Sequence, residues 1–404
     1  MNSIPSTLPL SRLVLEMQES ATLKMAKMAR ELKAQGKDII DLSLGEPDFD
    51  TPVHIKEAAK KALDDGYTKY TPVNGLLDLR QAIVKKFDRD HNLQYTVNQI
   101  VVSNGAKQSV FNLCMALLDP GDEVILPAPY WVSYFEIVKM AGGVPIVAQS
   151  TIEEDFKCDP SYIESLITDR TKFIMYSSPC NPSGSVLSYD ELKALASMLQ
   201  AHEHVLVVSD EIYEHINFTQ QHYTIASMEG MKDRTVIING MAKGYAMTGW
   251  RLGYIAGPDW IAEACTKIQG QVTSGATSFG QKAAAVALES DHTPTYEMVK
   301  AFHHRRDLII SLLEQIPLLM VNRPQGAFYI FPDVSAYFGK TSANGYLVKD
   351  ADDMSLYLLA EAQVSSVSGV AFGNDKCIRI SYATSDAKLQ DAVQRIAVAL
   401  ASLR

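Results

Sequence analysis

Five apolar runs constrain the fold of this chain more than any other feature. Each is rich in β-branched residues and ends in polar residues, glycine or proline: IVVSNG (100–105), DEVILPAP (122–129), KFIMYSSP (172–179), HVLVVSDE (204–211) and RTVIING (234–240). Segments with helical apolar spacing separate the runs; one of them, residues 188–200, opens with Ser188 as a helix cap and an acidic first turn. Strands that are apolar throughout indicate a parallel or mostly parallel sheet buried on both faces. The sequence therefore predicts an α/β fold.

The pattern changes near residue 290. A long helical stretch is followed by GAFYIFPDVS (326–335), another helix, KCIRISYAT and a C-terminal helix, which is typical of a smaller α+β domain. A helix near residues 20–35 is expected to join it or lead into it. We therefore expect a large domain over residues 51–294. The small domain would comprise residues 295–404 together with the N-terminal segment, residues 1–50.

Composition and charge argue against several classes of partner. The net charge of -10 argues against a nucleic-acid or anionic-membrane surface. No apolar run is long enough to span a bilayer, and the N-terminus does not resemble a signal peptide. The five cysteines are far apart and form no CxxC pair, so we expect no metal site and no disulfide framework. A reduced, cytoplasmic protein is expected.

Polar residues follow the carboxyl ends of the predicted strands, where parallel sheets bind ligands. They are Asn104, Asn181, Asp210 and Lys243. Lys243 is the most unusual, because lysine is seldom buried and this one lies between small residues after an apolar strand. A lysine desolvated at such a place has a lowered pKa and attacks carbonyl groups to form a Schiff base. The alternative is a surface lysine that opens a helix.

Asp210, Tyr213 and Asn181 have two possible interpretations each. Asp210 either caps a helix or faces the ring nitrogen of pyridoxal phosphate, which must stay protonated to accept electrons. Tyr213 follows one helical turn later on the same side. It either donates to the phenolic oxygen of that cofactor or is an aromatic residue at a domain seam. Asn181, in the rigid turn SSPCNPSG, is either a second donor to that oxygen or a turn residue.

The segment SNGAKQ (103–108) links a strand to a helix. Gly105 allows close approach of the backbone, and the free amides of the helix start can hold a phosphate. Arg251 could add a bidentate charged contact to the same phosphate. Many α/β turns look like this one, and Arg251 could also be an ordinary surface arginine.

The order and spacing of Asn181, Asp210, Tyr213, Lys243 and Arg251 resemble those of the fold-type I PLP-dependent aminotransferases of class I/II. The resemblance is closest to the bacterial aspartate aminotransferases of the I-beta subgroup. It covers nearly the whole chain, from SAT (20–22) through LSLGEPDFDTP (42–52) and KYTPVNGLLDLR (69–80) to FGNDKCIRISYAT (372–384). It implies a large domain with a mostly parallel seven-stranded sheet between helices, and a smaller α+β domain.

The resemblance also implies roles for residues around the cofactor. Lys243 would hold pyridoxal 5'-phosphate as a Schiff base and then move the proton between the substrate Cα and the cofactor. Asp210 would pair with the ring nitrogen. Tyr213 and Asn181 would bond the phenolic oxygen, and Trp131 would stack on the ring.

The phosphate and the substrate would be held by a second group of residues. Gly105, Ala106 and Arg251 would hold the phosphate, with Lys107 beside them. Tyr70 resembles the tyrosine that reaches the phosphate from the other subunit, which implies a homodimer.

Arg379 would clamp the substrate α-carboxylate, helped by Gly45, while Trp131 and Asn181 also line the substrate site. Lys107 matches a lysine associated with the distal carboxylate of aspartate and glutamate, and Thr22 also matches the pattern near the substrate. The alternatives are a solvated lysine at a helix start and a capping threonine.

The expected reaction is ping-pong transfer of an amino group from L-aspartate to 2-oxoglutarate. Two substitutions near the substrate entrance, Gln18 and Glu19, depart from the pattern and leave the use of prephenate open. Leu76 replaces a usual proline, Gly240 and Ala242 lack phosphate-binding hydroxyls, and residues 365–373 lack a customary proline.

Other functions remain as alternatives. An aromatic or other broad-specificity transaminase, or a PLP β-lyase, would use the same cofactor residues. A transcription regulator with an aminotransferase-like domain is not expected, because its N-terminal DNA-binding domain would have to fit before residue 20. No G-x-G-x-x-G follows a strand and no G-x-S-x-G is present, which argues against a nicotinamide dehydrogenase and a serine hydrolase.

Overall fold

The largest element of the computed structural model, which describes residues 9–219 and 221–404, is a sheet of seven strands. In spatial order the strands are β2 (Ile100–Ser103), β8 (Gly253–Ala256), β7 (Thr235–Gly240), β6 (Leu206–Asp210), β5 (Thr171–Ser177), β3 (Glu123–Pro127) and β4 (Val144–Ala148). Strand β8 is antiparallel to both neighbours, and the other neighbouring pairs are parallel. The predicted mostly parallel seven-stranded sheet is therefore confirmed.

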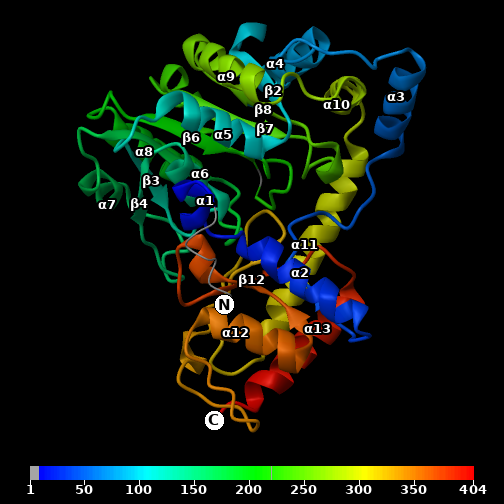
Figure 1. Cartoon of the computed structure of the whole chain (residues 1–404), viewed down its shortest axis with the longest axis vertical. Helices are drawn as coiled ribbons and strands as arrows, with labels where there is room; N and C mark the ends of the chain where they lie inside the picture. Colours follow the sequence, from blue (N-terminus) through cyan, green and yellow to red (C-terminus); the bar gives the residue numbers. More distant parts are fainter. Residues whose placement is uncertain (1–8, 220) are drawn as a thin grey trace.

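Helices cover both faces of this sheet (Figure 1). One face packs against α5 (Ala106–Leu117), α6 (Ser133–Met140) and α9 (Asp259–Val272). The other packs against α4 (Leu77–His91), α7 (Pro160–Ser165), α8 (Tyr189–Leu199) and α10 (Ser278–Glu289), and α3 (Val53–Asp64) packs on α10. Along β7, Val236 and Ile238 contact the first layer and Ile237 the second. A strand between two helical layers must be apolar at every position, which is why the runs do not alternate.

Strands β4 and β8 were not among the predicted apolar runs. Strand β4 lies at the edge of the sheet, begins with the exposed Val144 and contains Pro145. Strand β8 has four residues and follows Arg251 and Leu252 directly. Neither segment carries a long β-branched run, so the sequence pattern alone does not reveal them.

A second region has its own sheets and its own core. Strands β9 (Tyr329–Ile330), β11 (Val367–Ser368) and β12 (Ile378–Ser381) form an antiparallel sheet, and β1 (Ile40–Asp41) pairs in parallel with β10 (Val364–Ser365). Helices α11 (Thr293–Leu313), α12 (Ala351–Tyr357) and α13 (Asp386–Ala401) share an apolar core there. In Figure 1 this region lies below the large sheet, and α11 runs from one region towards the other. The expected α+β character is confirmed, whereas the boundaries at residues 50 and 294 stay predictions.

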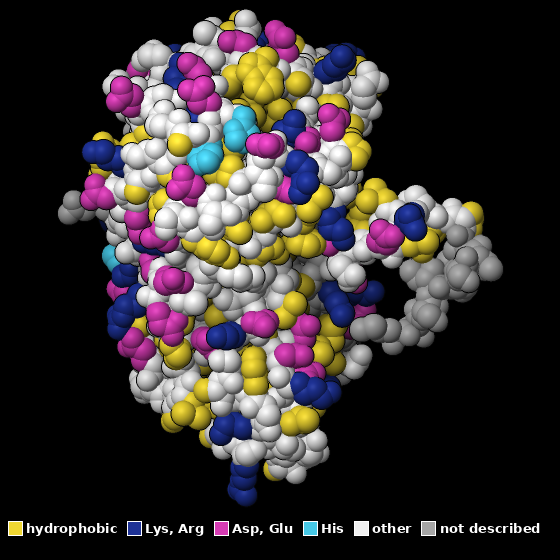
Figure 2. All heavy atoms as spheres, turned by 90° about the vertical axis from the view of Figure 1, so that its left-hand side faces the viewer, with side chains coloured by type: hydrophobic (Ala, Val, Ile, Leu, Met, Phe, Trp, Pro, Cys, Tyr) yellow, Lys and Arg dark blue, Asp and Glu magenta, His cyan; other side chains and the backbone are white. Residues whose placement is uncertain are grey.

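The N-terminal helices lie at the seam between the two regions. The helix predicted near residues 20–35 is α2 (Ala21–Ala34), whose Met25 and Ala29 pack against Ile39 and Leu359. It follows a short helix, α1 (Arg12–Glu16), which buries none of its residues. On the face shown in Figure 2, acidic and basic side chains are interspersed, so the net charge of -10 is not concentrated there.

Within the part of the chain that the structure describes, no helix is both long enough and apolar enough to cross a bilayer. Since β5, β6 and β7 are parallel, their carboxyl ends lie at one edge of the sheet. The turns that follow these strands open onto the seam with the smaller region. The pocket described next lies there.

Candidate active site

A cavity of about 370 Å³ lies at this edge of the sheet. The predicted site residues on its wall are Gly45, Ala106, Lys107, Trp131, Asn181, Asp210, Tyr213, Lys243, Arg251 and Arg379. These residues lie in segments far apart in the sequence, from Gly45 to Arg379, and the fold places them around one cavity. Two predicted residues do not line the cavity. Gly105 lies behind Arg251, and Tyr70 is fully exposed, at 99%.

Asp210 ends β6 and is buried at the cavity wall. Its Oδ2 accepts a hydrogen bond of 2.5 Å from the hydroxyl of Tyr134, and its Oδ1 accepts one of 3.2 Å from the backbone amide of Ile212. Burial raises the pKa of Asp210 to about 6, and these two hydrogen bonds oppose that shift. The carboxylate is therefore ionised at neutral pH and can face a cationic group in the cavity.

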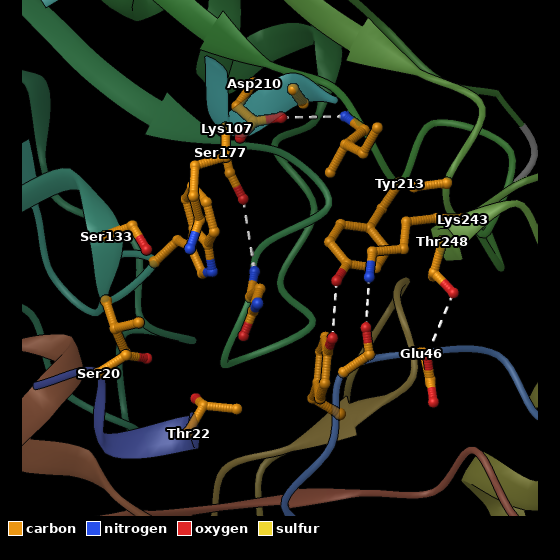
Figure 3. Close-up of a pocket in the computed structure, with 18 of the residues that line it drawn as sticks. Ser20, Thr22, Glu46, Lys107, Ser133, Ser177, Asp210, Tyr213, Lys243 and Thr248 are labelled. Atoms are coloured by element: carbon orange, nitrogen blue, oxygen red, sulfur yellow. Dashed lines mark hydrogen bonds between the residues drawn. The ribbon is translucent and has the colours of Figure 1, made fainter. Parts of the chain in front are cut away.

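Lys243 follows β7 and is half-buried. Its Nζ donates to the carbonyl oxygen of Gly45, as Figure 3 shows. Burial lowers the pKa of Lys243 to about 8; the charge of Arg379 adds to this shift, and that of Glu46 opposes it. At neutral pH more of this amine is therefore neutral than in an ordinary lysine, and the neutral amine can act as a nucleophile or base.

Tyr213 lies on the same side of the cavity as Asp210, but not because of a helical turn. Residues 212–215 form hydrogen-bonded turns, with Glu214 N donating to Glu211 O at 2.9 Å and Ile216 N donating to Tyr213 O at 2.8 Å. The predicted helical turn is wrong, while the shared side is confirmed. The Tyr213 hydroxyl lies 2.7 Å from that of Tyr329 (Figure 3).

Arg379, from β12, is 1% exposed. Its Nη1 donates to Asn181 Oδ1 at 2.9 Å, and its Nη2 donates to the carbonyl oxygen of Ser43 at 2.6 Å. The guanidinium lies over the rings of Tyr329 and Phe372, at 4.6 and 5.0 Å from their centroids. Its Nε has no hydrogen-bond partner among the described residues. A buried cation with an unpaired donor on a cavity wall is suited to bind an anion.

The start of α5 forms a cradle for a second anion. Gly105 caps the helix with a positive φ of 82°, and Ala106 is the first helical residue. A Cβ on Gly105 would collide with the guanidinium of Arg251, and one on Gly253 would collide with the amide of Ala106. The first amides of a helix lack partners within it, so they and Arg251 can hold a phosphate together.

The mouth of the cavity is lined by Trp131, Lys107 and the start of α2. Lys107 is exposed, and its Nζ lies 5.0 Å from the centroid of the Trp131 ring. Ser20 and Thr22 face the cavity from the opposite side (Figure 3). Thr22 thus lines the cavity, and its role near the substrate stays a prediction.

Several cavity residues were not predicted from the sequence. Tyr134 bonds Asp210, Tyr329 bonds Tyr213, and Thr248 Oγ1 donates to Glu46 at 3.1 Å. Ser133 and Ser177 also line the wall. Tyr134 lies in the segment APYWVSY (128–134) and Tyr329 in GAFYIFPDVS (326–335), but neither segment indicates which other side chain its tyrosine contacts.

Together these groups suit an aromatic cofactor that carries an aldehyde, a ring nitrogen and a phosphate. The amine of Lys243 fits the aldehyde, Asp210 fits a protonated ring nitrogen, and the α5 cradle fits the phosphate. Arg379 and Lys107 remain for the carboxylates of a substrate.

Comparisons with known proteins agree with this chemistry. The family described as aminotransferase class I and II matches residues 37–396. The aspartate/prephenate aminotransferase of Cereibacter sphaeroides is 45% identical over 98% of this chain and 99% of its own. The aspartate aminotransferase of Rhizobium meliloti superimposes with a TM-score of 0.95 at 41% identity, covering 98% of this chain and 100% of its own. That of Thermus thermophilus, solved with maleate, gives 0.91 at 40% identity, covering 97% and 100%.

Proposed function

We propose that this chain, which belongs to the class I and II aminotransferases and depends on pyridoxal 5'-phosphate, transfers the amino group of L-aspartate to 2-oxoglutarate. The products would be oxaloacetate and L-glutamate. The two half-reactions would alternate at the same pocket in a ping-pong sequence, because both substrates are dicarboxylates and need the same cations.

The observation that carries this proposal is that the cavity with Lys243 has two cations, Arg379 and Lys107, besides the Arg251 assigned to the phosphate. Arg379 is buried and fixed by Asn181 and Ser43, whereas Lys107 is exposed at the mouth. A planar guanidinium suits the α-carboxylate, which every amino-acid substrate has, and a flexible ammonium suits a distal carboxylate. The Thermus thermophilus relative was solved with maleate, which is itself a dicarboxylate.

The residues present fit pyridoxal 5'-phosphate. When bound, this cofactor withdraws electrons from the substrate Cα through its protonated ring. Asp210 would hold the ring nitrogen in its protonated form, and Tyr213 and Asn181 would donate to the phenolic oxygen. Trp131 would cover the ring, and Gly105, Ala106 and Arg251 would hold the phosphate. Lys107 would lie beside them, with its ammonium free for the substrate.

Lys243 has two roles in this proposal. Its amine would hold the cofactor between turnovers. When free, this amine, whose pKa burial lowers, would take the proton from the substrate Cα and carry it as a general base. Arg379 orients the substrate so that the bond to this proton faces Lys243.

We also propose a homodimer in which Tyr70 reaches the phosphate of the partner's site. Tyr70 is 99% exposed although it is a large aromatic residue, and it lies in the segment KYTP, which precedes α4. A tyrosine at this position that served only its own chain would be expected to pack against it.

The choice of L-aspartate is tested by Lys107→Ala. We expect kcat/KM for L-aspartate to fall about 10- to 100-fold, the worth of one charged hydrogen bond, with little change for L-phenylalanine. Lys139→Ala, which removes the same charge from a lysine over the Phe135 ring, is the control. An unchanged KM for aspartate in Lys107→Ala would contradict the dicarboxylate proposal. A panel with prephenate and aromatic donors would then identify the preferred substrates.

A further inference from the structure

The turn that follows β6 has two sides with different chemistry. Asp210 and Tyr213 line the cavity, whereas Glu211 and Glu214 lie away from it and are 1% and 7% exposed. A carboxylate removed from water must be paired with a positive charge or with hydrogen-bond donors. The partners of these two glutamates therefore decide where the turn lies.

Glu214 is held by residues of α4 and of its own turn. Its Oε2 lies 2.5 Å from Lys86 Nζ and 3.2 Å from His91 Nε2, and its Oε1 lies 3.2 Å from His215 Nε2. The side chain of Lys86 is fully buried, and its Nζ is also 3.1 Å from His91 Nε2. We call Lys86, His91, Glu214 and His215 the buried ion cluster. Although burial opposes ionisation, the charge of Lys86 holds the pKa of Glu214 well below its usual value.

Glu211 ties the same turn to the sheet. Its Oε1 accepts a hydrogen bond of 2.9 Å from Ser209 Oγ, and its Oε2 lies 3.1 Å from His222 Nε2. Ligand atoms of His91, Glu211 and Glu214 lie within 4.8 Å of one another, close enough to share a metal ion. The ammonium of Lys86 already provides a cation at this place, which favours a role for the cluster without a metal.

The buried ion cluster also contacts the turn that carries Lys243. His215 Nε2 lies 3.3 Å from the hydroxyl of Tyr245, and a Cβ on Gly244 would lie 2.6 Å from the His215 ring. Gly244 and Tyr245 follow Lys243 directly in the chain. One cluster thus supports the turns of both Tyr213 and Lys243 from behind.

We propose that Glu214 is a positioning residue, which Lys86 and His91 hold in place so that Tyr213 and Lys243 keep their places in the pocket. Longer-range backbone hydrogen bonds hold the two ends of the turn, from Glu211 N to Ile238 O and from Ala327 N to Ile216 O, both at 2.8 Å. The residues between these ends, 212–215, have only short-range backbone hydrogen bonds, so their side chains must fix their position. A buried ion pair adds little stability compared with apolar residues of the same size. Positioning is therefore the role for which this cluster is suited. The inference rests on the roles proposed above for Tyr213 and Lys243.

The test compares Glu214→Gln with the double variant Lys86→Met/Glu214→Gln. Glu214→Gln leaves Lys86 buried without its partner, so we expect a lower Tm. We also expect kcat to fall about tenfold with the KM for aspartate unchanged, since misplaced groups slow the reaction more than they weaken binding. The affinity of the apoenzyme for pyridoxal 5'-phosphate should fall as well. The double variant removes both charges, so Tm should recover while kcat and cofactor affinity stay low.

Glu123→Gln is the control for a purely structural effect. Glu123 is also a buried carboxylate, bonded by Thr168 at 2.6 Å and by Arg170 Nε at 3.0 Å, but it lies at the start of β3, far from the strand ends that form the pocket. Glu123→Gln should lower Tm and leave kcat unchanged. If kcat and cofactor affinity of the double variant recover together with Tm, Glu214 has no positioning role. A fully active Tyr213→Phe variant would contradict the role proposed for Tyr213 rather than the positioning role of Glu214.

Discussion

At the scale of single residues, the reactivity of Lys243 depends on its burial. Only the neutral amine attacks an aldehyde, and its fraction increases as pH rises through the pKa. Because burial lowers that pKa to about 8, the rate at which the apoenzyme captures pyridoxal 5'-phosphate should rise with pH and level off above about 8. Stopped-flow absorbance measures this rate. A rate that keeps rising to the ordinary lysine pKa of 10.5 would contradict the assigned environment.

The sequence predicted those cavity residues that carry their own chemical signal. Lys243, Asp210 and Asn181 are polar residues at, or a few residues after, the ends of apolar strands, and all three line the cavity. Tyr134 and Tyr329 were missed, because each acts on a residue that is distant in the sequence. A pairwise contact of this kind exists only after folding, so no local pattern encodes it.

At the scale of elements, the start of α5 offers a prediction about cofactor binding. Gly105→Ala would strain a backbone with a φ of 82° and push a methyl group into Arg251. We expect the dissociation constant for pyridoxal 5'-phosphate to rise at least about tenfold, since the phosphate cradle is disturbed. Equilibrium titration of the apoenzyme measures it.

Gly121→Ala is the matched control for this prediction. Gly121 has a similar φ of 93°, but a Cβ there would meet nothing within 4 Å. It should therefore lose a comparable amount of stability, about 1 kcal/mol, without a change in cofactor affinity. Equal affinity in both variants would mean that the start of α5 does not hold the phosphate.

Five strands that lie between two apolar layers were predicted correctly, whereas the turn after β6 was not. The five apolar runs became β2, β3, β5, β6 and β7, and Ser188 caps α8 in a capping box. The turn after β6 was predicted as helical because its spacing allows a helix. Its Glu214 instead pairs with Lys86 in the buried ion cluster, and its Glu211 pairs with His222, so the turn follows contacts with residues distant in the sequence.

At the scale of the whole molecule, the proposed homodimer makes a prediction about mixed subunits. Lys243→Ala should abolish the site of its own chain, whereas Tyr70→Ala should weaken the site of the partner. A dimer of one subunit of each kind would therefore contain one intact site. After the two variants exchange subunits in equal amounts, about a quarter of wild-type activity should return. No gain above the sum of the separate variants would show that Tyr70 does not act across an interface.

The organisation of the whole chain was predicted by its resemblance to a family more than by its composition. The large sheet and the smaller α+β region are present, while the cytoplasmic location and the domain boundaries stay predictions. Composition indicates the class of fold. The placement of the two regions relative to each other depends on contacts between them, such as the one between Tyr213 and Tyr329.

The most direct test is the visible spectrum of the purified protein before and after addition of L-aspartate without any 2-oxo acid. We expect the absorption band of the lysine-bound cofactor to be lost and the band of the aminated cofactor to grow, with oxaloacetate released. Lys243→Ala should not show the initial band. A cofactor band that L-aspartate leaves unchanged would contradict the proposed donor, and a protein that binds no pyridoxal 5'-phosphate would contradict the assignment of Lys243.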